Sequence, residues 1–168
     1  MKIALIGMPT SGKSTISKLY SDQQSCPMID VDAMLEEQFG CSLQDQIIKF
    51  GEAQFIKQEN DLLLSMRYPD NCIISTGGSV VYATTAMLAL KQYNVIFIYL
   101  EVPLEDLELR LVDQRNSRGI VMNGANTWKD LLDDRHRLYM QYADIVIDTY
   151  DKTPDVVLNE INARLAQW

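Results

Sequence analysis

The sequence predicts a three-layer, doubly wound α/β fold in which a five-stranded parallel sheet lies between two layers of helices. Short apolar, β-rich runs alternate along the 168 residues with longer stretches of helical periodicity, and this alternation is typical of βαβ units. The run at 96–100 is apolar without alternation, as expected of a strand that helices cover on both faces. The chain has neither repeats nor an evident linker, so we expect residues 1–168 to form a single domain.

The predicted elements follow one another with short connections. Strands are expected at residues 2–6, 27–31, 71–76, 95–100 and 144–148. Helices are expected at residues 13–22, 33–39, 43–50, 52–67, 84–92, 104–114, 128–142 and 155–166. The segment 115–126 breaks the pattern because it is polar and contains Gly119, Gly124 and three asparagines. We expect it to form a mobile loop. Open α/β sheets bind ligands beyond the carboxyl ends of their strands, so the residues that follow each strand are the candidates for a site.

Composition excludes several classes of function. The chain has 15 Lys and Arg against 23 Asp and Glu, a formal net charge of −8, which argues against general binding of nucleic acids or anionic membranes. Three scattered cysteines and one histidine argue against a structural zinc site and against Ser-His or Cys-His catalysis. Without a signal-peptide pattern or an apolar run of membrane-spanning length, we expect a cytoplasmic monomer.

The first strand is followed by a phosphate-binding motif. Residues 7–15 read Gly-Met-Pro-Thr-Ser-Gly-Lys-Ser-Thr, which matches the P-loop pattern G-x-x-x-x-G-K-[ST] between a strand and a helix. The glycines allow backbone N–H groups to turn toward a phosphate, and the helix adds its positive N-terminal end. We expect nucleotide contacts from Gly7, Ser11, Gly12, Lys13, Ser14 and Thr15. The fold expected is therefore that of the P-loop NTPases, close to the nucleoside kinases.

Two residues of the motif have specific expected roles. Lys13 is expected to reach the β- and γ-phosphates and to act in catalysis, while Ser14 is expected to bind Mg²⁺. The sequence has no N-K-x-D segment that would read guanine, so ATP is the expected nucleotide. The motif thus predicts an ATP-dependent kinase for a small-molecule hydroxyl.

Two aspartates end the second predicted strand. Asp30 and Asp32 are two residues apart, so on a strand both would face the same side. The strand at 71–76 has no acid at its end, and Asp30 is expected to hold Mg²⁺ instead. Asp32 is expected to orient the attacking hydroxyl or to act as its base. The alternatives are a solvated loop acid for Asp30 and a helix N-cap for Asp32.

With both motifs in place, the chain resembles the shikimate kinases along nearly its whole length. The segments that carry the resemblance are residues 7–15, Ile29-Asp30-Val31-Asp32, Gly51-Glu52-Ala53-Gln54-Phe55, Ser75-Thr76-Gly77-Gly78 and Arg135-His136-Arg137-Leu138-Tyr139 followed by Ala143-Asp144. The resemblance implies transfer of a phosphoryl group from ATP to shikimate, giving ADP and shikimate 3-phosphate. It also implies the use of Mg²⁺ and a place in aromatic amino acid biosynthesis.

The resemblance also implies roles for individual residues. Asp32 would bind the acceptor hydroxyls, Gly77 and Gly78 would approach the acceptor through their backbone, and Arg135 would pair with its carboxylate. From the sequence alone, Gly77-Gly78 could equally form a plain turn, and Arg135 a buried structural salt bridge. Phe55 is either a wall of the acceptor pocket or part of the core.

The loop at 115–126 is the expected lid of this family. Arg118 would close over the phosphates and stabilise charge on the transferring group, and Arg115 would also bind the nucleotide. An ordinary exposed charge is the alternative for Arg118.

The chain departs from the family pattern at the acceptor end and in the lid. The usual arginine after Phe55, a second clamp on the shikimate carboxylate, is Ile56, and the usual third glycine is Ser79. The lid has Gly119-Ile120-Val121 after its arginine rather than Pro-Leu-Leu. Two alternatives therefore stay open, which are a kinase for another small acceptor such as a sugar acid or nucleotide, and a nucleotide-binding module without turnover.

Overall fold

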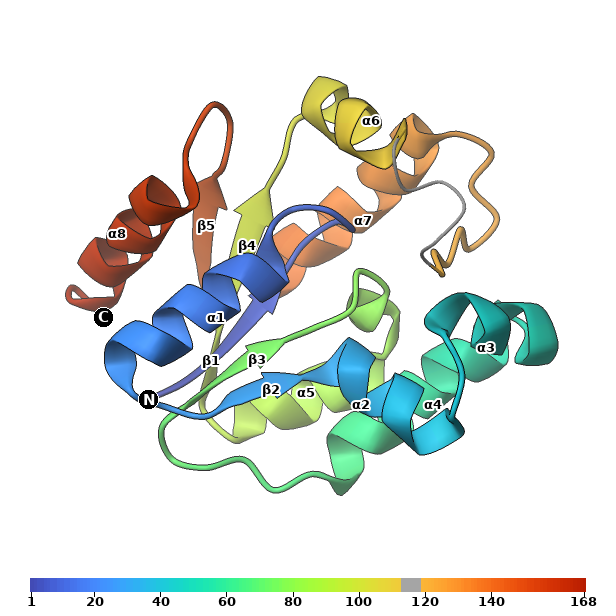
Figure 1. The fold of residues 1–168 in the computed structure, drawn as a ribbon, viewed down its shortest axis with the longest axis horizontal. Coiled ribbons are helices and arrows are strands. Elements are labelled where there is room, and N and C mark those ends of the chain that lie inside the picture. The colour runs from blue at the N-terminus through green and yellow to red at the C-terminus, as the bar shows by residue number, and fades with distance from the viewer. Residues whose placement is uncertain (113–118) are drawn as a thin grey trace.

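The computed structural model describes residues 1–112 and 119–168 of the chain. Within these residues, five strands form one parallel sheet in the order β2-β3-β1-β4-β5 (Figure 1). The strands are β1 (Lys2–Ile6), β2 (Met28–Asp30), β3 (Cys72–Ser75), β4 (Val95–Glu101) and β5 (Ile145–Asp148). The predicted five-stranded parallel sheet of a doubly wound α/β fold is confirmed.

Helices cover both faces of the sheet. They are α1 (Lys13–Gln24), α2 (Val31–Phe39), α3 (Leu43–Phe50), α4 (Glu52–Ser65), α5 (Thr84–Gln92), α6 (Leu104–Val112), α7 (Trp128–Tyr142) and α8 (Pro154–Leu165), with a 3₁₀ turn, η1 (Val80–Tyr82). Helices α1 and α8 pack on one face, and α4, α5 and α7 on the other, with α2 and α3 beside α4 (Figure 1). The arrangement has the three predicted layers.

Strand β1 shows how the sequence builds two cores. Ile3 and Leu5 join the apolar cluster under α1 and α8, whereas Ala4 and Ile6 join the cluster on the opposite face. All four side chains are fully buried. A strand that alternates between two helix layers has no polar face, which explains why β1 and β4 are apolar at nearly every position.

Capping side chains mark where several helices begin. Thr127 and Asp130 form a capping box before α7, and the Thr153 hydroxyl accepts the amide of Val156, with Pro154 in the first turn of α8. Such side chains satisfy N–H groups that have no partner within the helix. They bring α7 and α8 to start immediately after the loops at the carboxyl end of the sheet.

The structure differs from the sequence-based boundaries by one or two residues at several elements, and it adds one short turn. The strand predicted at 27–31 is only Met28–Asp30, because Asp30 caps α2 and the helix already begins at Val31. The helix predicted at 52–67 ends at Ser65. The turn η1 was not predicted, since a segment of three residues is too short to show a helical period.

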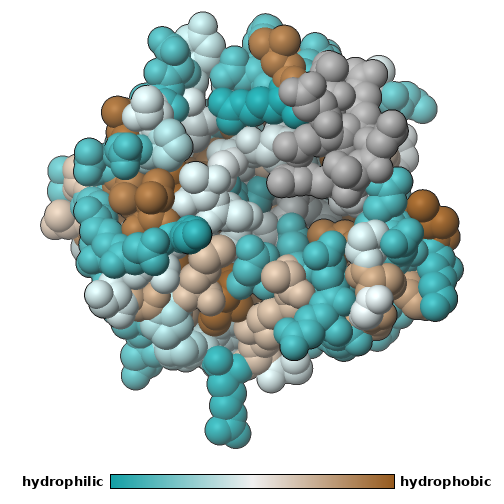
Figure 2. Space-filling model, in the orientation of Figure 1, coloured by the Kyte–Doolittle hydropathy of each residue, from teal (hydrophilic) through white to brown (hydrophobic). Residues whose placement is uncertain are grey.

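The carboxyl ends of the strands gather on one side of the molecule, and both termini lie on the other (Figure 1). Hydrophilic residues cover most of the face drawn in Figure 2, and the hydrophobic residues on that face form separate small groups. Within residues 1–112 and 119–168, no helix is both long and apolar enough to cross a membrane.

Candidate active site

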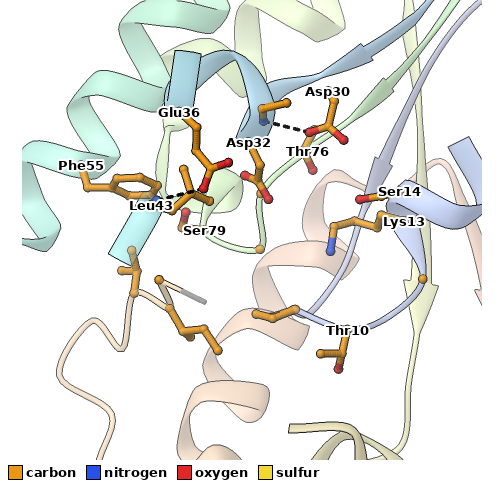
Figure 3. Close-up of a pocket in the computed structure, with 18 of the residues that line it drawn as sticks. Thr10, Lys13, Ser14, Asp30, Asp32, Glu36, Leu43, Phe55, Thr76 and Ser79 are labelled. Atoms are coloured by element: carbon orange, nitrogen blue, oxygen red, sulfur yellow. Dashed lines mark hydrogen bonds between the residues drawn. The ribbon is translucent and has the colours of Figure 1, made fainter. Parts of the chain in front are cut away.

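A pocket of about 500 Å³ lies at the carboxyl ends of β1, β2 and β3. Its walls come from the P-loop, the start of α2, the turn at 76–79, the segment 119–121 and α7. Figure 3 shows Lys13 and Ser14 on one side of the pocket, facing Asp32 on the other. The fold thus brings together side chains that lie more than 100 residues apart in the sequence.

The P-loop needs glycine at both ends of its turn. Gly7 has φ 149° and Gly12 has φ 91°, and L side chains rarely adopt such values. A Cβ atom on Gly7 would lie 2.7 Å from the carbonyl oxygen of Leu100. The loop curls around Lys13, whose Nζ donates hydrogen bonds to the carbonyl oxygens of Gly7 (2.9 Å) and Met8 (2.8 Å). A local segment therefore holds the ammonium group in the phosphate loop.

The magnesium ligands expected from the sequence are hydroxyl and carboxylate oxygens that line the same pocket. Ser14 and Asp30 both contribute to its wall, and the Ser14 Oγ lies 3.4 Å from the hydroxyl of Ser75 at the end of β3. Oxygen ligands are those that Mg²⁺ prefers, and this ion usually keeps several waters and phosphate oxygens as its other ligands. The described residues contain no cluster of three or more His, Cys, Asp or Glu that could hold a metal alone. The Ser14 hydroxyl and the Asp30 carboxylate fit an ion that takes its other ligands from phosphate and water.

The two aspartates are placed differently at the start of α2 from what the sequence indicated. Asp30, not Asp32, is the N-cap of α2, and its Oδ1 accepts the amide of Ala33 at 3.1 Å. Asp32 lies in the first turn of α2 rather than on a strand, so strand alternation is not what brings the two carboxylates together. The tight start of α2 does this, because both residues still line the pocket.

Gly77 and Gly78 lie where any side chain would collide with the site. A Cβ atom on Gly77 would lie 2.8 Å from Asp32 Oδ1 and 2.7 Å from Glu59 Oε1. A Cβ atom on Gly78 would lie 2.8 Å from Arg135 Nη1 and equally close to Pro9 Cδ. Their φ angles are not in the left-handed region, so space rather than backbone conformation requires glycine. This close packing distinguishes the segment from a plain turn.

Arg135 is almost fully buried, with 1% of its surface exposed. Its Nη2 donates to the carbonyl oxygen of Val121 at 2.6 Å, and its Cζ lies 5.4 Å from the ring centroid of Tyr82. Nε and Nη1 have no hydrogen-bond partner among the described residues, and the guanidinium pairs with no described carboxylate. The alternative of a structural salt bridge for Arg135 is therefore not seen in this part of the chain.

Phe55 is both a part of the core and a wall of the pocket, the two possibilities that the sequence left open. Its ring is 2% exposed and belongs to the core cluster, and it also lines the pocket. The neighbouring Ile56 is partly buried against the same cluster. The wall next to Phe55 is apolar there, and it carries no cation at position 56.

Two site residues were not found from the sequence. Arg110 lines the pocket next to the P-loop, and its Nη1 donates to the carbonyl oxygen of Thr10 at 3.2 Å. Glu59 is fully buried directly behind the turn at 77–79. Its spacing of four residues from both Phe55 and Leu63 places an acid on the inward face of α4. This is the same signal that singled out Arg135, and it could have identified Glu59.

The Glu59 carboxylate has an unusual environment. Its Oε2 accepts a hydrogen bond from the Ser79 hydroxyl at 2.8 Å, and its Oε1 has no partner among the described residues. Burial, and next the negative charge of Asp32, raise the pKa of Glu59 to about 7. The Ser79 hydrogen bond and the positive charges of Arg135 and Lys13 act in the opposite direction.

The described part of the predicted lid packs against α3 and α4. A Cβ atom on Gly119 would lie 2.5 Å from the Gln44 nitrogen. The two carboxylate oxygens of Glu52 accept the amides of Met122 (2.7 Å) and Asn123 (2.8 Å). Arg115 and Arg118, which the sequence assigned to the nucleotide, lie outside the described residues.

Comparison with known proteins gives concordant results. The family model described as shikimate kinase matches residues 9–166. A shikimate kinase from Dehalococcoides mccartyi (strain BAV1) is 34% identical over 166 residues, which is 99% of this chain and 94% of that protein.

Solved structures extend the comparison. The crystal structure of shikimate kinase from Aquifex aeolicus superimposes with a TM-score of 0.80 at 30% identity, covering 99% of this chain and 96% of the other. Shikimate kinase from Acinetobacter baumannii in complex with shikimate gives a TM-score of 0.85 at 25% identity, covering 99% and 93% of the two chains.

Proposed function

The chain belongs to the shikimate kinase family of ATP-dependent small-molecule kinases, and on this basis we propose that it phosphorylates shikimate. The observation that carries the proposal is the convergence of Lys13, Asp32 and Arg135 on one pocket. A phosphate-binding loop, an acceptor for a hydroxyl proton and a buried cation for a carboxylate are the three groups this transfer needs. The products would be ADP and shikimate 3-phosphate.

At the nucleotide end, the backbone of the P-loop and Lys13 hold the phosphates of ATP. Lys13 lies at the N-terminus of α1, where the helix dipole also favours negative charge. As the bond from the γ-phosphorus to its bridging oxygen breaks, negative charge grows on the phosphate oxygens. A fixed ammonium group stabilises this charge more strongly in the transition state than in the ground state.

Ser14 and Asp30 are the proposed ligands of Mg²⁺. When bound, the ion would neutralise charge on the β- and γ-phosphate oxygens. Asp30 also caps α2 through Oδ1, which fixes the direction in which its carboxylate faces the pocket.

At the acceptor end, Asp32 orients the attacking hydroxyl and accepts its proton while the new oxygen–phosphorus bond forms. Arg135 binds the acceptor carboxylate through Nη1, which lies beside Gly78 and has no hydrogen-bond partner among the described residues. Gly77 and Gly78 line the same pocket and are the proposed backbone contacts of the acceptor. The acceptor is thereby held between a carboxylate that binds hydroxyls and a cation that binds its acid group.

The segment 115–126 is proposed as the lid, with Arg118 and Arg115 approaching the phosphates on closure. Glu52 anchors the far end of this segment by accepting two of its amides. A lid tethered at one end excludes water from the phosphoryl group without losing its position over the pocket. We further propose that the protein acts in aromatic amino acid biosynthesis as a cytoplasmic monomer that binds neither nucleic acids nor membranes.

A coupled assay of ADP release with shikimate as acceptor tests the proposal. We expect ADP release that depends on both Mg²⁺ and shikimate and saturates with shikimate. Absence of acceptor-dependent ADP release at millimolar shikimate would reject this acceptor.

One structural feature favours a second candidate, a kinase for another small hydroxylated acid. Ile56 places an apolar side chain where the family has a second arginine, and loss of one charge-assisted hydrogen bond weakens binding by about 1.5–3 kcal/mol. Thermal-shift measurements with a non-hydrolysable ATP analogue can compare shikimate with sugar acids and nucleotides. Stabilisation by shikimate alone would remove the alternative acceptors. Nucleotide binding without transfer to any acceptor would instead indicate a module that has lost turnover.

A further inference from the structure

Glu59 lies behind the acceptor pocket rather than on its wall. Its side chain projects from α4 and is fully buried. Its Oε1 lies 2.7 Å from the point that a Cβ atom on Gly77 would occupy, and Oδ1 of the pocket-lining Asp32 lies 2.8 Å from the same point. The buried carboxyl therefore lies close to Asp32, a residue of the pocket wall, on the side of Gly77 that has no side chain.

Few hydrogen-bond donors or positive charges of the described residues lie near the Glu59 carboxyl. Ser79 donates the hydrogen bond to its Oε2, and Oε1 is without a partner in the described structure. The charged and titratable groups that act on it are Lys13 from α1, Asp32 from α2, and Arg135 and Tyr139 from α7. Arg135 is not in a salt bridge with Glu59. Among the described residues, Glu59 thus has one direct hydrogen-bond donor and no direct counterion.

The proton on Glu59 decides the net charge of the buried group around Arg135. With Glu59 protonated, the Arg135 side chain carries an uncompensated positive charge that an acceptor carboxylate can neutralise. With Glu59 ionised, the acceptor meets a second negative charge next to that of Asp32. Like charges in a poorly solvated site disfavour each other's ionised form, so acceptor binding and Glu59 ionisation oppose one another.

We propose that Glu59 is a positioning residue that takes up a proton when an anionic acceptor binds to Arg135, so that acceptor affinity falls as the pH rises. The inference rests on the proposed binding of an acceptor carboxylate at Arg135. The raised pKa of Glu59, about 7, places the transition in the neutral range, where an ordinary acceptor carboxylate is already ionised. Linkage makes the coupling reciprocal. The bound acceptor must raise the proton affinity of Glu59 by the same factor by which protonation of Glu59 raises the affinity for the acceptor.

Ser79 sets where this transition occurs. Its hydroxyl stabilises the ionised form of Glu59 through the 2.8 Å hydrogen bond. Position 79 has φ −86° and ψ −7°, which alanine adopts without strain. Ser79→Ala therefore removes the donor while keeping the backbone, and the pH transition of acceptor binding should move upward.

Calorimetric titration of the nucleotide-free protein with shikimate tests the proposal. Nucleotide is left out because its terminal phosphate itself titrates near neutral pH. Two buffers with different ionisation enthalpies report the protons taken up. For the wild type, we expect net proton uptake and a Kd that rises roughly fivefold from about pH 6 to about pH 8. Glu59→Gln should show neither effect and should keep a low Kd throughout.

Asp61→Asn is the matched control. Asp61 is on the same helix, exposed and paired with Lys57 at 2.5 Å, so this variant removes one negative charge away from the pocket. It should retain the proton uptake and pH dependence of the wild type. A Glu59→Gln protein whose Kd changes with pH as the wild type's does would overturn the proposal. If Glu59→Gln does not fold, an unchanged transition in Ser79→Ala would overturn it.

A separate probe distinguishes this inference from the proposed function. Failure of shikimate to bind at any pH would reject shikimate as acceptor. The carboxyl of Glu59 can then be followed by NMR in protein labelled with [¹³C]glutamate, with and without cyclohexanecarboxylate, which supplies the anion without hydroxyls. We expect the titration midpoint of Glu59 to rise when this carboxylate is added, and an unchanged midpoint would refute the coupling.

Discussion

The two ends of the pocket are built in different ways. At the phosphate end, Lys13 is held by carbonyl oxygens five and six residues away in the same loop. At the acceptor end, Glu59 meets a hydroxyl 20 residues away, and Arg135 meets a carbonyl 14 residues away. The first end is made by local backbone geometry, whereas the second depends on tertiary packing of charged side chains. The phosphate end is thus specified by a short segment of sequence, whereas the proposed acceptor end is specified by packing between distant segments.

The largest expected effect lies at the phosphate end. Lys13→Ala removes the ammonium group that stabilises developing charge, and we expect kcat to fall by roughly 10³-fold. The fold should persist, because the amide cradle and the core do not depend on this side chain. Steady-state kinetics together with the circular dichroism spectrum check this, and a near-normal kcat in a folded variant would contradict the role of Lys13.

The next effect concerns stability at the acceptor end. The folded protein binds the Glu59 proton more tightly than the unfolded chain, because the pKa rises from 4.5 to about 7. The contribution to the free energy of unfolding should therefore fall as the pH rises from about 4.5 to about 7, by up to about 3 kcal/mol.

Urea unfolding at several pH values measures how steeply the free energy of unfolding falls with pH. Glu59→Gln should remove it, while Asp61→Asn should leave it unchanged. Equal slopes for the wild type and Glu59→Gln would mean that the Glu59 carboxyl is not desolvated as described.

A smaller effect is expected from Arg135→Ala. If Arg135 binds a ground-state carboxylate, the acceptor KM should rise by about 10- to 100-fold, with a smaller change in kcat and in the KM for ATP. This outcome would sharpen the division between the two ends, because the nucleotide end is left intact. An unchanged acceptor KM would assign Arg135 to folding alone, through its bond to Val121.

The smallest effect concerns the tether of the proposed lid. Glu52→Gln can accept only one of the two amides that the carboxylate now accepts, from Met122 and Asn123. The loss should be about 1 kcal/mol, seen as faster hydrogen exchange at these two amides. Exchange rates identical to those of the wild type would show that the tether does not restrain this segment.

The same division explains how much could be predicted from the sequence. The succession of short apolar runs and helical stretches and the P-loop pattern are local signals, and they were sufficient for the parallel sheet and for the phosphate loop between β1 and α1. The start of α2 was misplaced because Asp30 caps the helix, and capping competes with strand propensity over single residues. The pairing of Glu59 with Ser79 joins two elements whose contact no local pattern indicates, although an acid on the inward face of α4 gave a clue.

Direct transfer of label from [γ-³²P]ATP to shikimate in a single turnover tests the central claim, that both ends of the pocket act on one reaction. The account predicts that labelled shikimate 3-phosphate forms as ATP is consumed, with little free phosphate. It also predicts that Lys13→Ala abolishes transfer even at saturating shikimate, whereas Arg135→Ala recovers transfer when shikimate is raised. Consumption of ATP to free phosphate with no labelled acceptor would contradict the account.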